Sequence, residues 1–231
     1  MPPPGLFITG TDTDIGKTYV TCHIARQLIA GGHVVGAYKP AVSGAGHNAA
    51  GQPVWADIEE LHAATGKQFP RERICPQRFN APLAPPSAAR AENRTVDAPL
   101  LRSGADWWRT QCDFLLIEGA GGLLSPIAEQ ETVADIAQDL GYPLIVVARL
   151  GLGTINHTLL TLEAAAQSGL TVAGIVLNEA AVSDHDASIQ TNAADLARFT
   201  KVPVLEILRH NNAEDVARLG EIDWITLAAI E

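Results

Sequence analysis

Residues 5–20 read GLFITGTDTDIGKTYV, and this stretch decides the fold class. It joins an apolar, strand-like run at 5–9 to a helical pattern through a loop that ends in Gly-Lys-Thr at 16–18. A loop of this kind at a strand-to-helix junction is typical of phosphate binding, in the pattern G-x-x-x-x-G-K-[ST]. Thr11 replaces the first glycine of that pattern, and Gly10 lies one residue too early. The stretch therefore predicts a nucleotide-binding βα unit with one departure from the usual loop.

Strand-like and helical patterns alternate outward from this loop. The predicted strands are 5–9, 33–40, 113–122, 143–149, 171–178 and 202–208, and the predicted helices are 17–32, 132–140, 154–169 and 186–200, with two more near 55–65 and 96–111. Strands that alternate with helices form βαβ units, in which a mainly parallel sheet is covered on both faces. No repeat and no long linker divides the chain. We therefore expect an α/β fold with a single P-loop NTPase-like domain over 1–231.

Composition and charge restrict the classes of function. The chain has 231 residues, 47% of them hydrophobic, which suits one well-buried core. A formal net charge of −10 without a basic stripe argues against a nucleic-acid partner. The N-terminus shows no secretory pattern, and apolar runs such as 143–148 are far too short to cross a bilayer. Cys22, Cys75 and Cys112 are widely spaced, as is typical of buried thiols in a reducing compartment. We expect a soluble, cytoplasmic protein with no membrane partner.

Polar residues follow the predicted strands and are expected to meet at one edge of the sheet. In an open parallel sheet, ligands bind where the strands reach their carboxyl ends. Lys39 ends the second strand, Glu118 follows four apolar residues in the third, and Asn178 ends the fifth. The loop amides and Lys17 would hold the phosphates of a nucleotide, and Thr18 would ligate Mg²⁺. The sequence thus predicts a nucleotide site at this edge.

The same residues have simpler interpretations too. An acidic residue after a Walker B-like apolar run favours a Mg²⁺ role for Glu118 over a solvated strand end. Lys39 fits a site and a solvated strand end about equally, and Asp57 taken alone fits the surface of a helix. The seven histidines are scattered without the spacing of metal ligands. We therefore expect no histidine metal site.

Seven features of the chain, in this order, resemble one known family. They are GTDTDIGKT at 10–18, YKPAVSG at 38–44, Asp57, FNAPLAPPSAA at 79–89, EGAGGLLSP at 118–126, LGTINHTLLT at 152–161 and GIVLNE at 174–179. Together they resemble the dethiobiotin synthase family over nearly the whole chain. The phosphate loop of that family commonly reads Gly-Thr-Asp-Thr, so the resemblance accounts for Thr11.

The resemblance implies a reaction with three substrates. The family joins CO₂ to 7,8-diaminononanoate with ATP and Mg²⁺. One amine becomes a carbamate, ATP phosphorylates the carbamate to a carbamic–phosphoric anhydride, and the second amine closes a cyclic urea and releases phosphate. A carbamate is a weak anionic nucleophile, so it must be held in line with the γ-phosphate and have its charge compensated.

The resemblance also implies roles for individual residues. The ATP-binding positions are Asp14, Ile15, Gly16, Lys17, Thr18, Tyr19, Glu118, Gly119, Ala120, Gly121, Asn178, Ile207, Leu208 and Arg209. The catalytic positions are Lys39, Lys17 and Thr13, and the Mg²⁺ ligands are Thr18, Asp57 and Glu118. The substrate positions are Thr13, Ser43, Gly153, Thr154, Ile155 and Asn156. In the family the helix that begins at 153–156 comes from the partner subunit, so the resemblance implies a homodimer with shared sites. The chain departs from the family at Leu208, where a proline is frequent.

Two other classes share the loop and the sheet. Partition and metal-insertion ATPases use hydrolysis to drive a partner, and they usually place a lysine early in the phosphate loop. Thr11 and Asp12 stand there in this chain, which argues against that class. Cobyrinate-amidating enzymes carry a further glutamine-hydrolysing domain, for which 231 residues leave no room.

Overall fold

The centre of the fold is a six-stranded sheet. The computed structural model describes residues 2–181 and 186–230. The strands lie in the order β10-β9-β8-β1-β7-β2, and every neighbouring pair is parallel. Their bounds are β1 Gly5–Gly10, β2 Val35–Tyr38, β7 Phe114–Glu118, β8 Leu144–Arg149, β9 Val172–Asn178 and β10 Val204–Leu208. The predicted mainly parallel α/β sheet is confirmed, and each predicted strand forms part of it.

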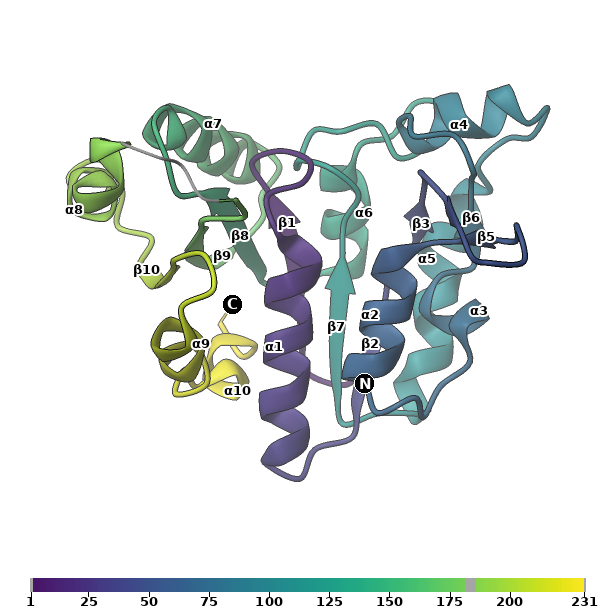
Figure 1. Cartoon of the computed structure of the whole chain (residues 1–231), viewed down its shortest axis with the longest axis horizontal. Helices are drawn as coiled ribbons and strands as arrows, with labels where there is room; N and C mark the ends of the chain where they lie inside the picture. Colours follow the sequence, from purple (N-terminus) through teal and green to yellow (C-terminus); the bar gives the residue numbers. More distant parts are fainter. Residues whose placement is uncertain (1, 182–185, 231) are drawn as a thin grey trace.

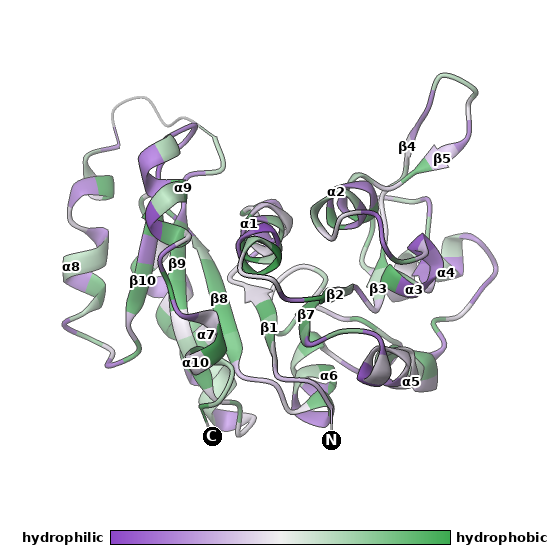
Figure 2. Cartoon of the chain, turned by 90° about the horizontal axis from the view of Figure 1, so that it is seen from below, coloured by the Kyte–Doolittle hydropathy of each residue, from purple (hydrophilic) through white to green (hydrophobic). Residues whose placement is uncertain are grey.

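Helices cover both faces of this sheet (Figures 1 and 2). On one face lie α1 (Lys17–Ala30), α2 (Ala56–Ala64) and α9 (Ala213–Leu219), and on the other lie α5 (Ala98–Asp106), α6 (Val133–Leu140) and α7 (Thr154–Gln167). The remaining helices are α3 Arg71–Ile74, α4 Pro85–Ala91, α8 Asn192–Leu196, α10 Trp224–Leu227 and the 3₁₀ turns η1 Trp107–Thr110 and η2 Ala187–Gln190. None of the helices among the described residues has both the length and the apolarity that a membrane span requires.

The two-sided cover explains the composition of the strands. All residues of β1 and β7 are buried, as are all but the last residue of β8. Strands buried on both faces read as continuous apolar runs rather than alternating ones, and Figure 2 shows these strands as the most hydrophobic part of the chain. A buried aromatic, Trp108 of η1, packs against Gly36 of β2 and closes the edge of this core.

The segment between β2 and β7 adds two small sheets. Strand β3 (Ala41–Val42) pairs in parallel with β6 (Gln77–Arg78), and β4 (Gly46–His47) pairs antiparallel with β5 (Pro53–Val54). The β4–β5 hairpin projects from the body of the molecule beside α2 (Figure 2). The sequence patterns predicted neither sheet, because pairs of two residues are too short to show a period.

One predicted helix is divided in the structure. The range 186–200 contains η2 and α8, which are separated at Thr191. Asn192 is buried there, and its side-chain nitrogen donates to the Gly151 carbonyl at 3.1 Å. A β-branched residue followed by an asparagine with a tertiary partner weakens a continuous helix, so the prediction of one helix over this range is wrong.

Candidate active site

A cleft opens at the carboxyl ends of the strands. Its volume is about 960 Å³. The strand order reverses on either side of β1, and in open α/β sheets the crevice at such a point is where ligands bind. The predicted site residues that line it are Thr13, Asp14, Gly16, Lys17, Thr18, Tyr19, Lys39, Ser43, Asp57, Glu118, Ala120, Gly121, Asn178 and Arg209. Residues that are far apart in the sequence thus meet at the predicted edge.

The phosphate loop is held in a tight, partly left-handed conformation. Asp14 has φ of 56° and Gly16 has φ of 91°. A side chain at Gly16 would also collide with Asn178, since a Cβ would lie 2.1 Å from Asn178 Nδ2. Main-chain N–H groups in such a turn at the start of a helix form a concave anion site. Glycine at 16 is therefore required both by the backbone angle and by the close approach of a side chain.

Lys17 extends back over the loop. Its Nζ donates to the Asp12 carbonyl at 2.8 Å, and its side chain is 7% exposed. Burial lowers the pKa of Lys17 to about 8, and the neighbouring Lys39 charge acts in the same direction, while Glu118 opposes the shift. An incoming polyanion such as a triphosphate would supply the negative charge that this ammonium group lacks.

Lys39 is the centre of a charge cluster in which Lys39 and Glu118 are buried and Asp57 is partly exposed. Its Nζ lies 2.6 Å from Glu118 Oε1 and 2.7 Å from Asp57 Oδ2. Burial alone would lower the pKa of Lys39, but the charges of Glu118 and Asp57 outweigh it and raise that pKa. Burial likewise opposes ionisation of Asp57, yet the Lys39 charge lowers its pKa. Lys39 is therefore charged at neutral pH and held between two carboxylates, and it is not a solvated strand end.

Two hydroxyl groups of α1 complete the surroundings of Glu118, which is 1% exposed. Thr18 Oγ1 donates to Oε1 at 2.7 Å, and Thr21 Oγ1 donates to Oε2 at 2.8 Å. Thr21 was not predicted, although it lies one helical turn after Thr18 on the same face of α1. The spacing of three residues between Thr18 and Thr21 could have revealed this second hydroxyl group in the sequence.

The side-chain oxygen atoms of Thr18, Asp57 and Glu118 are of the donor types that Mg²⁺ binds. They are two carboxylates and a hydroxyl, and the carboxylates already share one cation, the Lys39 ammonium. Mg²⁺ prefers such hard oxygen donors and usually keeps several waters. The described residues contain no group of three or more acidic, histidine or cysteine side chains placed to hold a metal. Three protein oxygens with phosphate and water ligands remain a suitable set for this ion.

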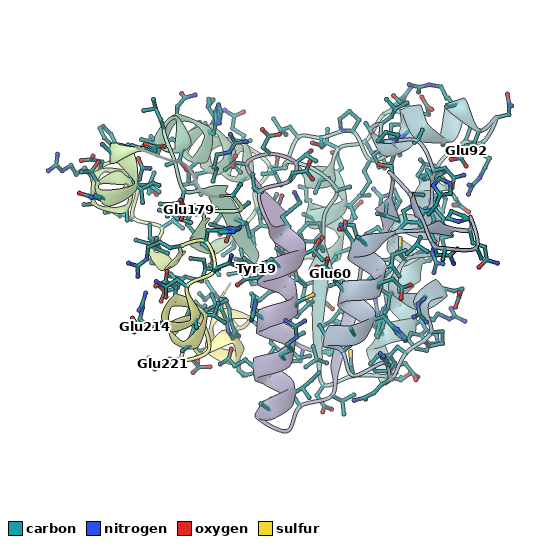
Figure 3. All side chains as sticks on the ribbon, in the orientation of Figure 1. Tyr19, Glu60, Glu92, Glu179, Glu214 and Glu221 are labelled. Atoms are coloured by element: carbon teal, nitrogen blue, oxygen red, sulfur yellow. The ribbon has the colours of Figure 1, made fainter. Side chains whose placement is uncertain are left out.

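The β9–β10 side of the cleft forms its other end. Asn178 donates from Nδ2 to the Ile15 carbonyl at 2.8 Å, so it contacts the phosphate loop directly. Glu179 accepts from the His210 N–H at 2.9 Å, which fixes the loop after β10. Figure 3 shows Glu179 on the β9 side of α1 and Glu60 on its α2 side. The cleft therefore extends from β9 on one side of α1 to α2 on the other side.

Some predicted site residues lie outside the cleft lining. Ile207 and Leu208 are in β10 and pack into the core, whereas Arg209, His210 and Asn211 line the cleft. Gly119 and Ile15 lie beneath the surface of their loops, next to Val133 and Gly10. The remaining four are Gly153, Thr154, Ile155 and Asn156, at the start of α7 and apart from the lining of this cleft.

Other lining residues were missed by the sequence interpretation. Glu60 follows Asp57 by three positions on α2, and this spacing could have found it. Trp55, Leu83 and Pro85 come from the irregular segment between β2 and β7, where no sequence pattern points to a cleft. These three add apolar surface to the cleft lining.

Comparison with known proteins agrees with this geometry. A family described as the AAA domain matches residues 4–225. The ATP-dependent dethiobiotin synthetase BioD of Anaeromyxobacter dehalogenans is 46% identical over 225 residues, which are 97% of this chain and 97% of that protein. The chain belongs to the dethiobiotin synthetase family. The BioD of Rhodopirellula baltica is 39% identical and aligns with 88% of this chain and 83% of its own. The family predicted from the sequence motifs is confirmed.

Similarity to solved structures supports the fold alone. The Pyrococcus furiosus cell division ATPase MinD superposes with a TM-score of 0.53 at 17% identity, over 96% of this chain and 98% of its own. The fold of this dethiobiotin synthetase family member is therefore P-loop NTPase-like, and the predicted fold class is confirmed.

Proposed function

We propose that this protein uses ATP to join CO₂ to the two amines of 7,8-diaminononanoate and so forms dethiobiotin. Its membership of the dethiobiotin synthetase family supports this activity, as does the ATP dependence that the names of its relatives state. ADP and phosphate would be the other products. The substrates would be ATP, CO₂ and the diamine.

One observation carries the proposal further than the fold does. Lys39 follows a strand separated from β1 by β7, and its ammonium lies against Glu118 and Asp57 beside the phosphate loop. A hydrolase that only cleaves ATP has no need of a second buried cation there. A carbamate that attacks the γ-phosphate needs such a cation, because its negative charge must be compensated as it approaches another anion. Lys17 and Lys39 would therefore lie on either side of the reacting groups.

The first half of the reaction follows from this placement. An uncharged amine adds to CO₂, forms the C–N bond and releases a proton, which leaves a carbamate. A carbamate oxygen then attacks the γ-phosphorus, and the bond to ADP breaks. Hydroxyl groups of Thr13 and Ser43 in the cleft lining would bind the carbamate or the amine. Alignment of these groups lowers the barrier because the reactants no longer have to find one another in solution.

The second half closes the ring. The other amine attacks the carbonyl carbon of the anhydride, the C–O bond to the phosphoryl group breaks, and phosphate leaves with the electron pair. Thr18, Asp57 and Glu118 would hold Mg²⁺, which supplies charge neutralisation to the phosphate oxygens. Lys17 would hold the phosphates during both halves, since it is fixed against the loop at Asp12.

We also propose a homodimer with shared sites in the cytoplasm. The segment 153–156 begins α7, and no side chain caps the N–H groups of this helix start, but the segment lies outside the cleft lining of its own chain. In a two-fold dimer such a segment would act on the partner's cleft and bind the distal carboxylate of the diamine. Leu152, just before this helix, and Leu160, within it, are exposed, and exposed apolar side chains are typical of an interface.

Isotope labelling tests the proposed activity. The pure protein would be incubated with ATP, Mg²⁺, ¹³CO₂ and 7,8-diaminononanoate, and the products analysed by mass spectrometry. We expect dethiobiotin that carries one ¹³C in its ring carbonyl. ATP hydrolysis without a labelled ring would contradict the proposal and favour a nucleotide-driven switch.

A further inference from the structure

Three side chains among the described residues donate hydrogen bonds to the Glu118 carboxylate. Thr18 Oγ1 and Lys39 Nζ both donate to Oε1, at 2.7 Å and 2.6 Å. Thr21 Oγ1 donates to Oε2 at 2.8 Å. Thr21 is fully buried and lies outside the cleft lining, whereas the other two donors line the cleft. Of these three donors, Thr21 is therefore the one that a ligand in the cleft would not contact.

The Thr21 hydroxyl group has two acceptors within reach for its one hydrogen. The Lys17 carbonyl, in the preceding turn of α1, lies 2.9 Å from Oγ1, and Glu118 Oε2 lies 2.8 Å from it. The contact with the carbonyl is the ordinary one for a threonine inside a helix. A hydrogen bond to a carboxylate is about twice as strong as one between neutral groups, so the hydrogen belongs to Glu118. This bond links α1 to the end of β7.

A buried carboxylate needs a donor for each of its two oxygen atoms. Glu118 is 1% exposed, and a buried oxygen atom without a partner costs free energy. Without the Thr21 hydroxyl group, Oε2 would have no donor among the described residues. The carboxylate would then turn so that both oxygen atoms shared the donors of Oε1. The bond from Thr21 therefore sets the orientation of the whole carboxylate group.

The other two donors are themselves exposed to ligands of the cleft. Lys39 also pairs with Asp57 at 2.7 Å, and an incoming anion would compete for its charge. Thr18 gives its one hydrogen to Oε1, which leaves the lone pairs of its oxygen for a cation. Ligands can therefore weaken both bonds to Oε1, whereas the buried bond from Thr21 is outside their reach.

We propose that Thr21 is a positioning residue, which orients the Glu118 carboxylate so that Oε1 and the Thr18 hydroxyl group together form one side of a divalent-cation site. The inference rests on the proposed function, in which Thr18, Asp57 and Glu118 hold Mg²⁺. Residues that orient metal ligands in this way typically contribute about 10- to 100-fold to metal affinity. Thr21 acts on the cation only through Glu118, so it should leave the binding of the nucleotide itself unchanged.

The affinity for Mn²⁺ tests this role, because Mn²⁺ takes the same oxygen ligands as Mg²⁺ and is detected by electron paramagnetic resonance. Mn²⁺ would be titrated into the complex of the protein with β,γ-methylene-ATP, whose terminal phosphate cannot be transferred. Thr21→Val removes the hydroxyl group at nearly constant volume, and Mn²⁺ should then bind about tenfold more weakly or worse. Thr21→Ser keeps the hydroxyl group and should bind Mn²⁺ nearly as tightly as the unmodified protein. Full affinity in Thr21→Val would overturn the proposal.

Binding of the same analogue in the presence of EDTA separates positioning from a general effect on α1. Thr21→Val also removes the contact with the Lys17 carbonyl, and a distorted α1 would weaken the binding of the analogue without metal as well. We expect the metal-free dissociation constant to stay that of the unmodified protein. An equal loss of affinity with and without metal, or a Thr21→Ser variant as weak as Thr21→Val, would overturn the positioning role.

Thr65→Val is the matched control. Thr65 is a buried threonine at the end of α2 whose hydroxyl group donates to the Leu61 carbonyl at 2.9 Å, and it lies outside the cleft lining. This variant should bind Mn²⁺ as the unmodified protein does, and a loss as large as that in Thr21→Val would count against the proposal. If Thr21→Val does not fold, Thr21→Cys replaces it, because a thiol is a weak donor. Thr21→Cys should bind Mn²⁺ more weakly than Thr21→Ser, and equal affinities would overturn the proposal.

Failure of this inference differs from failure of the proposed function. A protein that shows the expected order of Mn²⁺ affinities but forms no dethiobiotin would contradict the proposed function and support the role of Thr21. An unmodified protein whose complex with the analogue binds no Mn²⁺ would overturn the role of Thr21 together with the cation site.

Discussion

Lys39 shows how one residue acquires its properties from its surroundings. In the sequence it is a polar strand end, but in the structure it is 4% exposed and bonded to two carboxylates. Neither carboxylate is near it in the chain. The local sequence could not reveal this contact, because Asp57 lies in an irregular segment and Glu118 on another strand. The strand ends placed Lys39 and Glu118 at the same edge of the sheet, but only the family resemblance added Asp57 to them.

Loss of the Lys39 charge should destabilise the protein. Lys39→Met leaves Glu118 buried without its counter-ion, and breaking such a pair typically costs about 3–5 kcal/mol. The free energy of unfolding would be measured by urea titration in the presence of EDTA. The double variant Lys39→Met with Glu118→Gln should regain part of the loss, because no uncompensated charge then remains. A loss of less than about 1 kcal/mol in the single variant would contradict the cluster.

Lys17 should matter for turnover rather than for folding. Lys17→Ala removes the cation that is fixed against the loop, and loss of one group that stabilises charge in a transition state costs about 10²–10³ in rate or more. Steady-state formation of dethiobiotin measures the effect. Lys201→Ala, at an exposed lysine outside the cleft lining, is the control and should behave as the unmodified protein. Near-normal turnover in folded Lys17→Ala would refute the phosphate site.

The elements after β9 show what sequence patterns can and cannot predict. The apolar run at 202–208 predicted β10 as a strand of the parallel sheet, and the structure confirms it. α9 was missed because its seven residues carry mostly charged and small side chains. Its position depends on Asp215, a buried carboxylate that receives hydrogen bonds from Arg209 and Arg218. Such a contact depends on tertiary structure, which no periodicity encodes.

This contact between β10 and α9 predicts a pH dependence of stability. The Arg209 hydrogen bonds lower the pKa of Asp215 from 3.8 to about 2. A carboxyl group with a lowered pKa stabilises the fold above its unfolded pKa, and this contribution disappears as the pH falls through the folded value. The stability difference between the unmodified protein and Asp215→Asn should therefore shrink by about 1 kcal/mol between pH 6 and pH 3. A difference that does not change over this range, in urea titrations, would contradict the pairing.

At the scale of the whole molecule, the separation of the α7 start from the cleft predicts a dimer with shared sites. Lys17→Ala and Asn156→Asp should each be inactive, the second because a carboxylate would repel the substrate carboxylate. In mixed dimers one site combines an intact loop with an intact α7 start. After subunit exchange, the mixture should recover about a quarter of the normal activity if the subunits associate at random. Complete inactivity after proven exchange would refute shared sites.

Coupling of ATP use to ring formation is the most direct test of the central claim, that this P-loop fold forms a bond instead of driving a partner. ADP release would be followed with Mg²⁺-ATP while the diamine and CO₂ are supplied separately and together, and dethiobiotin would be measured in the same samples. The two ion pairs of Lys39, with Asp57 and with Glu118, lead us to expect negligible ADP unless the diamine and CO₂ are both present, and then one dethiobiotin for each ADP. Equal ADP release with and without the diamine would contradict the account.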